Sequence, residues 1–306
     1  MSFILEERGG LKYFVPGNIK AAAAFATRLG GVSGGGEDSP LYNLNLGFKK
    51  KYDTDENVRK NYDIIADAVG FSVNNIIYAH QKHTDNILVC GENFLRDNKN
   101  NMLPLPEDYI YDAMVTDIPG ILLTVRIADC APVLFWDEEH NAVGAAHCGW
   151  RGTLNKLQVR TALKMREIYG TSLRDLKVAI GPCISKCCYE VSGEFYEDFV
   201  NTLGERVKIY FRRGGVSPPA NQTRNEITGG KTPPLQTNNK YMCDLKGINK
   251  MLLLSDAQCA PLQDKIDENN IEISPDCTYC GEDLFFSHRR QGECRGTLGA
   301  FIGLSE

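Results

Sequence analysis

The chain has 306 residues, of which 42% are hydrophobic and 24% are charged, a composition typical of a globular protein with a substantial core. Its 34 basic and 39 acidic residues give a net charge of −5, which argues against a nucleic-acid binder and against a polybasic membrane anchor. The N-terminus has no long apolar run, and charged residues interrupt the longest apolar stretch, 118–136, so we expect a soluble cytoplasmic protein.

The first half of the chain predicts several strands around one helix. A short strand at 13–15 precedes the segment 27–47, which is rich in Gly, Ser, Asn and Asp and is typical of a loop. A helix follows, in which Asp53 and Glu56 form a capping-box pair and Gly70 supplies the stop. Apolar runs predict further strands at 76–78, 87–89, 113–116, 120–127, 132–136 and 142–146.

The second half mixes helices and strands without strict alternation. Helices are predicted at 153–169, 192–204 and 243–260, and strands at 176–180, 270–273 and 297–304. The stretch 212–240 contains four prolines and little apolar content, which predicts an exposed insertion. The pattern favours the α+β class with mixed sheets, arranged as a single domain over 1–306.

A cysteine and a histidine lie on either side of a predicted turn at 137–140. If the hairpin is symmetric about the bond between Glu138 and Glu139, Cys130 and His147 face each other. Directly opposed residues have Cβ atoms about 4.5–5.5 Å apart. A sulfur and an imidazole nitrogen at that separation can share one zinc ion.

A third ligand must come from another segment, because two strands cannot surround a metal. Among the five histidines, His80 and His83 are the best candidates, since they lie in a polar loop between two strands. Three protein ligands leave a fourth position for water, which is the arrangement of a catalytic zinc. The plainer alternative is that Cys130 is a small buried residue and His147 is only hydrogen-bonded.

The segment 149–153, GWRGT, turns directly into a predicted helix. A helix N-terminus presents free N–H groups to an anion, and Arg151 adds a planar donor fork suited to phosphate. A metal beside an anion pocket indicates hydrolysis or group transfer. The alternative is a glycine-rich turn with a surface arginine.

The chain contains eleven cysteines, an odd number with scattered spacing, which favours thiols or metal ligands over a disulfide framework. Cys277 and Cys280, with His288 and Cys294 downstream, are candidates for a structural zinc site, although the second half lacks a regular ligand pair. The three cysteines within 181–191 include an adjacent pair. Adjacent cysteines rarely bind one ion, so core packing is predicted for this cluster.

A series of motifs in order resembles the bacterial laccase-domain family, once described as multicopper polyphenol oxidases and now known as purine nucleoside phosphorylases. The most specific are ADCAPVLFWD and AHCGWRGT, and the resemblance runs over nearly the whole chain. The motifs are TRLGGVS (27–33), LNLG (44–47), AHQKH (79–83), ADCAPVLFWD (128–137), AHCGWRGT (146–153), GPCISKCCYEV (181–191) and CT…FFSHRR…RG (277–296).

The resemblance implies an α+β fold, a layered sandwich of mixed β-sheets flanked by helices, and the metal ligands His83, Cys130 and His147, with zinc favoured over copper. The implied substrates are purine nucleosides and phosphate. The activities would be phosphorolysis of adenosine, inosine, guanosine and methylthioadenosine, together with deamination of adenosine. We expect Arg151 to hold the attacking phosphate and Asn45 to orient the substrate or the metal-bound species.

The chain departs from the family at positions that bear on phosphate binding. Tyr62 stands on the inward helical face where the family commonly has arginine, so a cation is missing there. Arg126 stands where the family favours glutamine. In a strand, Arg126 would share the face of Cys130, and we hypothesise that it replaces the lost cation and binds phosphate.

Three other functions stay open at this point. A copper oxidase of phenols needs more histidine ligands than five histidines conventionally supply. A cysteine hydrolase would use Cys130 as nucleophile and His147 as base. A non-enzymatic zinc-stabilised binding module would fold around the metal without turning over any nucleoside.

Overall fold

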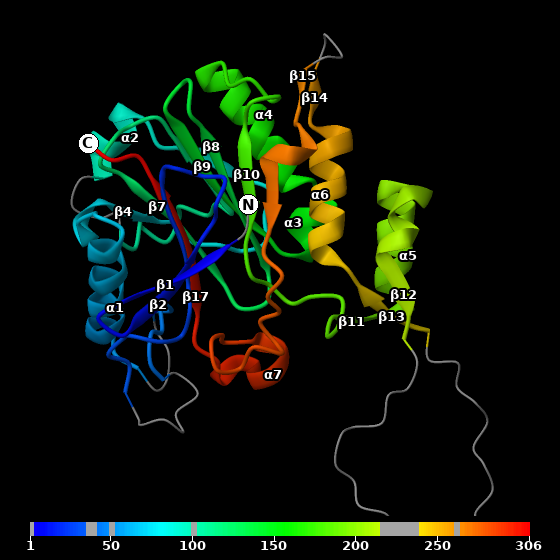
Figure 1. The fold of residues 1–306 in the computed structure, drawn as a ribbon, viewed down its shortest axis with the longest axis horizontal. Coiled ribbons are helices and arrows are strands. Elements are labelled where there is room, and N and C mark those ends of the chain that lie inside the picture. The colour runs from blue at the N-terminus through cyan, green and yellow to red at the C-terminus, as the bar shows by residue number, and fades with distance from the viewer. Residues whose placement is uncertain (1–2, 35–41, 49–52, 99–102, 215–238, 260–263) are drawn as a thin grey trace, which may run out of the picture.

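A computed structural model describes residues 3–34, 42–48, 53–98, 103–214, 239–259 and 264–306. Its centre is a pair of six-stranded mixed sheets that pack face to face (Figure 1). The first has the order β1 (Ile4–Arg8), β2 (Leu11–Val15), β3 (Ala22–Ala26), β17 (Leu298–Gly303), β7 (Leu122–Ile127) and β4 (Ile76–Tyr78). The second has the order β16 (Ile271–Ile273), β10 (Lys177–Ile180), β8 (Ala131–Asp137), β9 (Ala142–Cys148), β6 (Ala113–Thr116) and β5 (Ile87–Val89). The β4–β7, β5–β6 and β10–β16 pairs are parallel and the other pairs are antiparallel.

Three hydrophobic clusters define the layers. Between the sheets, Leu123 and Val125 of β7 lie in one cluster with Leu134 and Trp136 of β8. The helix α1 (Asp55–Ala68) covers the outer face of the first sheet, and the side chain of its Tyr62 is fully buried. The outer face of the second sheet is covered by α3 (Trp150–Leu154) and α4 (Leu157–Tyr169). The helices α6 (Leu245–Asp256) and α5 (Gly193–Leu203) pack farther out and share the same hydrophobic cluster. In Figure 1, α1 lies left of the sheets and α6 and α5 lie right. The predicted α+β sandwich is confirmed.

The remaining elements are peripheral. A small sheet has the order β11 (Glu190–Ser192), β13 (Lys240–Cys243) and β12 (Phe211–Arg213). The others are α2 (Glu92–Asn98), β14 (Gln258–Cys259), β15 (Asp264–Lys265), α7 (His288–Gln291) and 3₁₀ turns at Val73–Asn75, Glu205–Tyr210, Glu268–Asn270 and Gly292–Cys294. The two ends of the predicted insertion, 212–240, lie in the antiparallel strands β12 and β13. Its interior, 215–238, lies outside the described residues.

Local sequence patterns predicted most elements, with two corrections at helix ends. The N-cap of α1 is Thr54, whose side chain accepts the Asn57 N–H, and not Asp53. The predicted helix at 153–169 is split into α3 and α4, because Lys156 adopts a left-handed conformation with φ of 57°. In the two central sheets, the strands β1 and β3 were missed, and most of the short peripheral elements were not predicted either. The exposed pattern of β1 and the alanine-rich sequence of β3 carry little strand signal.

The β8–β9 hairpin has a different register from the predicted one. Pro132, and not Cys130, pairs with His147, because the turn occupies 138–141 and lies one residue later than expected. A slip of one residue would turn a side chain to the other face of the sheet, whereas a slip of two residues keeps it on the same face. Cys130 and His147 therefore still face the first sheet. The last pair of the register is Ala131 with Cys148, so the next pair would set Gly149 opposite Cys130.

Two connections cross from the first sheet to the second at one end of the sandwich. The chain leaves β4 for β5 through a loop that contains His83, and leaves β7 for β8 through 128–130. Because β4 and β7 are parallel neighbours, their carboxyl ends lie at the same edge. In the described part of the chain, no helix has both the length and the apolar character needed to cross a membrane.

Candidate metal centre

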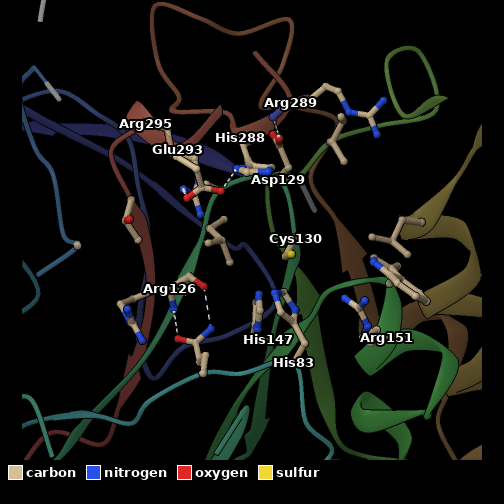
Figure 2. A pocket seen from close by; sticks show the side chains of 18 of the residues that line it. His83, Arg126, Asp129, Cys130, His147, Arg151, His288, Arg289, Glu293 and Arg295 are labelled. Carbon is tan, nitrogen blue, oxygen red and sulfur yellow. Dashed lines mark hydrogen bonds and ion pairs between the residues drawn. The ribbon is translucent and has the colours of Figure 1, made fainter. Parts of the chain in front are cut away.

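His83, Cys130 and His147 converge where these connections cross. Their ligand atoms all lie within 4.8 Å of one another, and the two imidazole centroids are 4.9 Å apart. Figure 2 shows the two rings side by side below the Cys130 sulfur. His80, the other candidate from the same loop, lies elsewhere, and its Nε2 is 2.8 Å from the Leu105 carbonyl oxygen. The structure thus brings together the three predicted ligands and not His80.

Asp112, directly before β6, positions two of the three candidate ligands. Its buried carboxylate accepts backbone N–H groups from Lys82 at 3.1 Å, His83 at 3.1 Å and Thr84 at 2.7 Å. It also lies 2.8 Å from His147 Nδ1, which leaves His147 Nε2 to face the centre. A carboxylate behind a histidine is the usual outer partner in metal sites, where it fixes ring orientation and raises ligand basicity. Sequence analysis missed Asp112, because one aspartate before a buried strand has no distinctive pattern.

The charges at the centre suit a bound cation. Burial disfavours the charged form of His147, but the Cys130 sulfur and the Asp112 carboxylate outweigh it and raise the pKa of His147 to about 9. Burial and the neighbouring His147 lower the pKa of His83. A metal requires neutral imidazoles and a thiolate, so its binding must release the His147 proton.

Gly149 lies against the centre and leaves room for the ligand atoms. A Cβ atom at this position would lie 2.9 Å from Cys130 Sγ and 3.0 Å from His83 Nδ1. Two imidazoles, one thiolate and a side open to a pocket form the donor set of a four-coordinate site with one exchangeable position. The residues therefore fit a divalent ion such as zinc.

Asp129 anchors the crossing that carries Cys130. It has a φ of 88°, and its carboxylate accepts hydrogen bonds from the Thr278 hydroxyl at 2.6 Å, the Ser287 hydroxyl at 3.0 Å and the Arg289 N–H at 2.7 Å. The left-handed conformation is uncommon outside glycine and is maintained here by these three bonds. The C-terminal segment thus determines where the Cys130 sulfur lies.

A pocket of about 600 Å³ opens above the three ligands, within the size range of small-molecule sites. Four arginines and two acidic residues contribute charge. The charged residues lining it are Arg126, Arg151, Arg289, Arg295, Asp129 and Glu293. The aromatic residues are Phe48, Trp150 and Tyr189. Arg126 and Arg151 lie on opposite sides of the ligands in Figure 2. Arg289 and Arg295 were missed as site residues, although the basic SHRR…RG sequence carried a signal.

Arg126 lines the pocket from a different sheet face than predicted. Its guanidinium lies 3.9 Å from the centroid of the Tyr78 ring, on the α1 side of the first sheet. The argument that it shares the strand face of Cys130 is wrong, because β7 and β8 belong to different sheets. Nevertheless, both residues line the pocket. The Nε atoms of Arg126 and Arg295 are buried and have no hydrogen-bond partner among the described residues.

The other two predicted binding residues differ in position. Arg151 is exposed at the pocket, 4.2 Å from the centroid of the Trp150 ring. Asn45 is fully buried and does not line the pocket. Its amide oxygen accepts the N–H groups of Gly47 and Thr297, each at 3.0 Å, so it positions two backbone segments that do line the pocket.

The comparisons with known proteins agree with the fold. The family model described as multi-copper polyphenol oxidoreductase laccase matches residues 22–305. A purine nucleoside phosphorylase of Bacteroides thetaiotaomicron is 31% identical over 246 residues, which cover 80% of this chain and 79% of that protein. Purine nucleoside phosphorylase YlmD of Bacillus subtilis is 28% identical over 290 residues, with 94% and 90% covered. The crystal structure of hypothetical protein YfiH from Bacillus licheniformis superposes with a TM-score of 0.77 at 26% identity, covering 98% of each chain. The chain therefore belongs to this laccase-like family, and these two curated relatives are named purine nucleoside phosphorylases.

Proposed function

We propose that this protein is a metal-dependent purine nucleoside phosphorylase. The observation that carries the proposal is the convergence of His83, Cys130 and His147 at a cationic pocket. There, Arg126 and Arg295 each have a buried Nε with no hydrogen-bond partner among the residues that the structure describes. An N–H donor buried without a partner destabilises the empty site and favours an anionic ligand. The relatives named purine nucleoside phosphorylases support this reaction class.

The pocket residues have separate roles in the proposed reaction. Arg126 and Arg151 hold phosphate, and one phosphate oxygen forms a bond to the anomeric carbon of the ribose. The bond from that carbon to the purine nitrogen breaks, and the base leaves with the electron pair and takes up a proton. Holding the two reactants in line contributes about 7–11 kcal/mol to the lowering of the barrier. Phe48 and Tyr189 offer aromatic faces to the purine.

We infer that the metal is zinc and that His83, Cys130 and His147 are its ligands. When bound, zinc supplies Lewis-acid chemistry to a substrate atom in the pocket. Multicopper chemistry would need further histidines, but His80 bonds Leu105 and His140 bonds Asp137. His288 lines the pocket beside Glu293 and is not grouped with the three ligands. The long axial methionine common in blue-copper sites is also missing from the described pocket lining.

We extend the proposal to deamination of adenosine and to a cytoplasmic location. The same metal centre can activate water, which supports deamination. None of the ten cysteines whose side chains are described forms a disulfide, which is typical of reducing compartments.

A nucleoside screen tests the proposal. Purified protein is incubated with adenosine, inosine, guanosine or methylthioadenosine, with and without phosphate, and the products are separated by chromatography. Release of free base that requires phosphate, together with ribose 1-phosphate from the three ribonucleosides, is the expected result. Conversion of adenosine to inosine without phosphate reports deamination. If no free base is released from any of the four compounds, the proposed function is rejected. If the protein contains copper and takes up oxygen only when a phenol is present, the polyphenol oxidase is supported instead.

An Arg126→Gln substitution is expected to raise the phosphate KM about tenfold or more, because hydrogen bonds to charged groups contribute about 1.5–3 kcal/mol. The variant tests whether Arg126 supplies the cation missing at Tyr62. Arg126→Lys keeps the charge without the planar fork and should be intermediate. Arg96→Gln, an exposed arginine on α2 paired with Asp97, is the control. Full phosphorolysis with an unchanged phosphate KM in Arg126→Gln would refute this role.

A further inference from the structure

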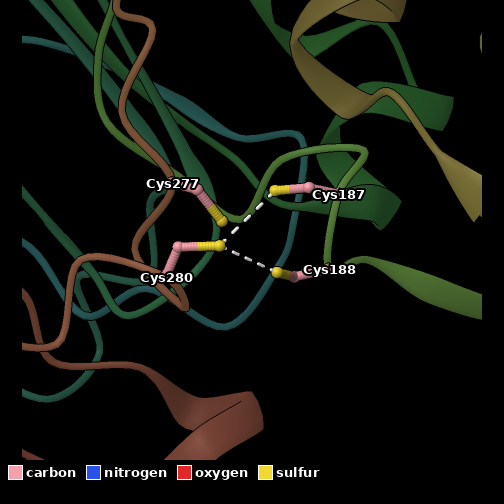
Figure 3. Close-up of side chains that lie close together, drawn as sticks. All are labelled: Cys187, Cys188, Cys277 and Cys280. Atoms are coloured by element: carbon pink, nitrogen blue, oxygen red, sulfur yellow. Dashed lines mark hydrogen bonds between the residues drawn. The ribbon is translucent and has the colours of Figure 1, made fainter. Parts of the chain in front are cut away.

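A second group of potential ligands lies outside the pocket. The sulfur atoms of Cys187, Cys188, Cys277 and Cys280 all lie within 4.8 Å of one another. Figure 3 shows the two pairs pointing toward each other from separate loops. We propose that these four cysteines bind one zinc ion as a closed, structural tetrathiolate site.

The sulfur separations fit a single tetrahedral ion. With zinc–sulfur bonds of about 2.3 Å, the edges of the tetrahedron are about 3.8 Å. Cys280 Sγ lies 3.6 Å from Cys187 Sγ and 3.1 Å from Cys188 Sγ. Both distances exceed the disulfide bond length of about 2.05 Å. Iron–sulfur clusters attach cysteines to different irons and so separate the sulfurs further, whereas four sulfurs within 4.8 Å suit one ion.

The backbone around Cys277 is arranged for a thiolate. Its sulfur accepts the Ser185 N–H at 3.4 Å and also receives backbone N–H groups of Tyr279 and Cys280. Gly281 N–H bonds the Cys277 carbonyl oxygen at 2.9 Å and closes the turn between the two cysteines. N–H groups that converge on sulfur stabilise its charged form, as do the outer partners of metal ligands.

The exposure of the cysteines argues against core packing. Cys183, in the same motif, is buried in the core, as predicted for this cluster. Cys187 is exposed and Cys188 is half-buried, so the core-packing prediction is wrong for this pair. The predicted partners of Cys277 and Cys280 also change, because His288 and Cys294 are not in the group. The sequence downstream of Cys277 and Cys280 offered no regular second pair of zinc ligands. The adjacent cysteines Cys187 and Cys188 supply that pair.

This site would fix the wall of the pocket. Its two loops adjoin Tyr189, which lines the pocket, and Thr278, whose hydroxyl bonds Asp129 next to Cys130. Arg290 also donates to the Thr278 carbonyl oxygen at 3.0 Å. Zinc between the loops would therefore stabilise the segment that positions Cys130, without touching the substrate.

Metal counting tests the site without any activity assay. Protein purified under reducing conditions should contain two zinc ions per chain, and Cys280→Ser should lose one of them and melt at a lower temperature. Cys294→Ser, an exposed cysteine outside the group, is the matched control and should keep both. Equal zinc in Cys280→Ser and the wild type would overturn the proposal, as would iron in place of zinc or a disulfide among the four cysteines.

A second variant covers the possibility that Cys280→Ser does not fold. His147→Ala removes a ligand of the pocket centre and should leave only the proposed tetrathiolate zinc. X-ray absorption of this variant should show sulfur as the only neighbour, at about 2.3 Å. Nitrogen neighbours, or no remaining zinc, would contradict the assignment whether or not the protein is a phosphorylase.

Discussion

A Cys130→Ser variant is expected to lose the metal of the pocket centre and about 1,000-fold or more in kcat/KM for phosphorolysis. A serine hydroxyl has nearly the same shape as the thiol but stays protonated, so the centre loses its only anionic ligand. Loss of a single preorganised electrostatic group costs about 10²–10³-fold in catalysis, and here the whole cation leaves. Metal content per chain and steady-state kinetics with inosine and phosphate measure the two effects.

Cys148→Ala separates this loss from general destabilisation. Cys148 is adjacent to His147 on β9 but is buried in the core on the opposite face of the second sheet. Its truncation removes packing and should lower the melting temperature while metal and activity stay at wild-type levels. If Cys130→Ser keeps its metal but loses activity, Cys130 acts as a nucleophile and the cysteine hydrolase is favoured. If it keeps both, Cys130 has no role in the centre.

Local patterns predicted the elements that carry the centre because each depends on a short stretch of sequence. The strands β4, β5 and β6 are brief apolar runs between polar segments and lie where predicted. The prediction that Cys130 and His147 lie on the same face was correct although the predicted register was wrong. The register error is two residues, and a shift of two residues keeps a side chain on the same face of the sheet. Within one hairpin, the face on which a side chain lies can therefore be predicted even when the register is not.

The alternation of side-chain faces along a strand no longer predicts which residues lie together once the chain passes from one sheet to the other. It also says nothing about contacts between residues far apart in the sequence. Arg126 and Cys130 are four residues apart, yet Arg126 lies in β7 of one sheet and Cys130 lies directly before β8 of the other. The role of Asp112 depends on N–H groups 28 to 30 residues earlier in the chain. The four-cysteine group joins residues 92 and 93 apart. Such pairings follow from the packing of the sandwich and have no periodic signal in one sequence.

The choice of His83 over His80 illustrates the same limit. The two histidines share one polar loop, and residue type alone left both open. His83 has a φ of 59°, and its N–H is held by Asp112, which turns the ring toward Cys130. His80 bonds a backbone oxygen on the other side of the loop. Backbone conformation therefore decides which of the two rings faces Cys130.

A Gly149→Ala substitution is expected to displace the metal and lower kcat/KM by about 100-fold or more. Residue 149 has a φ of −61° and a ψ of 174°, which alanine adopts without strain, so backbone conformation does not explain a glycine here. The explanation is steric, because the added Cβ would lie 2.9 Å from Cys130 Sγ and 3.0 Å from His83 Nδ1. Two of the three ligand atoms must then move, and a misplacement of about 1 Å costs about 10²-fold in rate.

The expected signature of Gly149→Ala is a folded protein with weak metal binding, in which excess zinc partly restores activity. Its metal-free form should melt close to the metal-free wild type, because the methyl group fills space that is open when the ligands are displaced. Gly91→Ala is the control, since a Cβ at that position meets no atom within 4 Å. Metal titration with a competing chelator measures the change in affinity. If Gly149→Ala binds metal as tightly as Gly91→Ala, the ligand atoms do not close around residue 149, and the proposed centre loses its geometric basis.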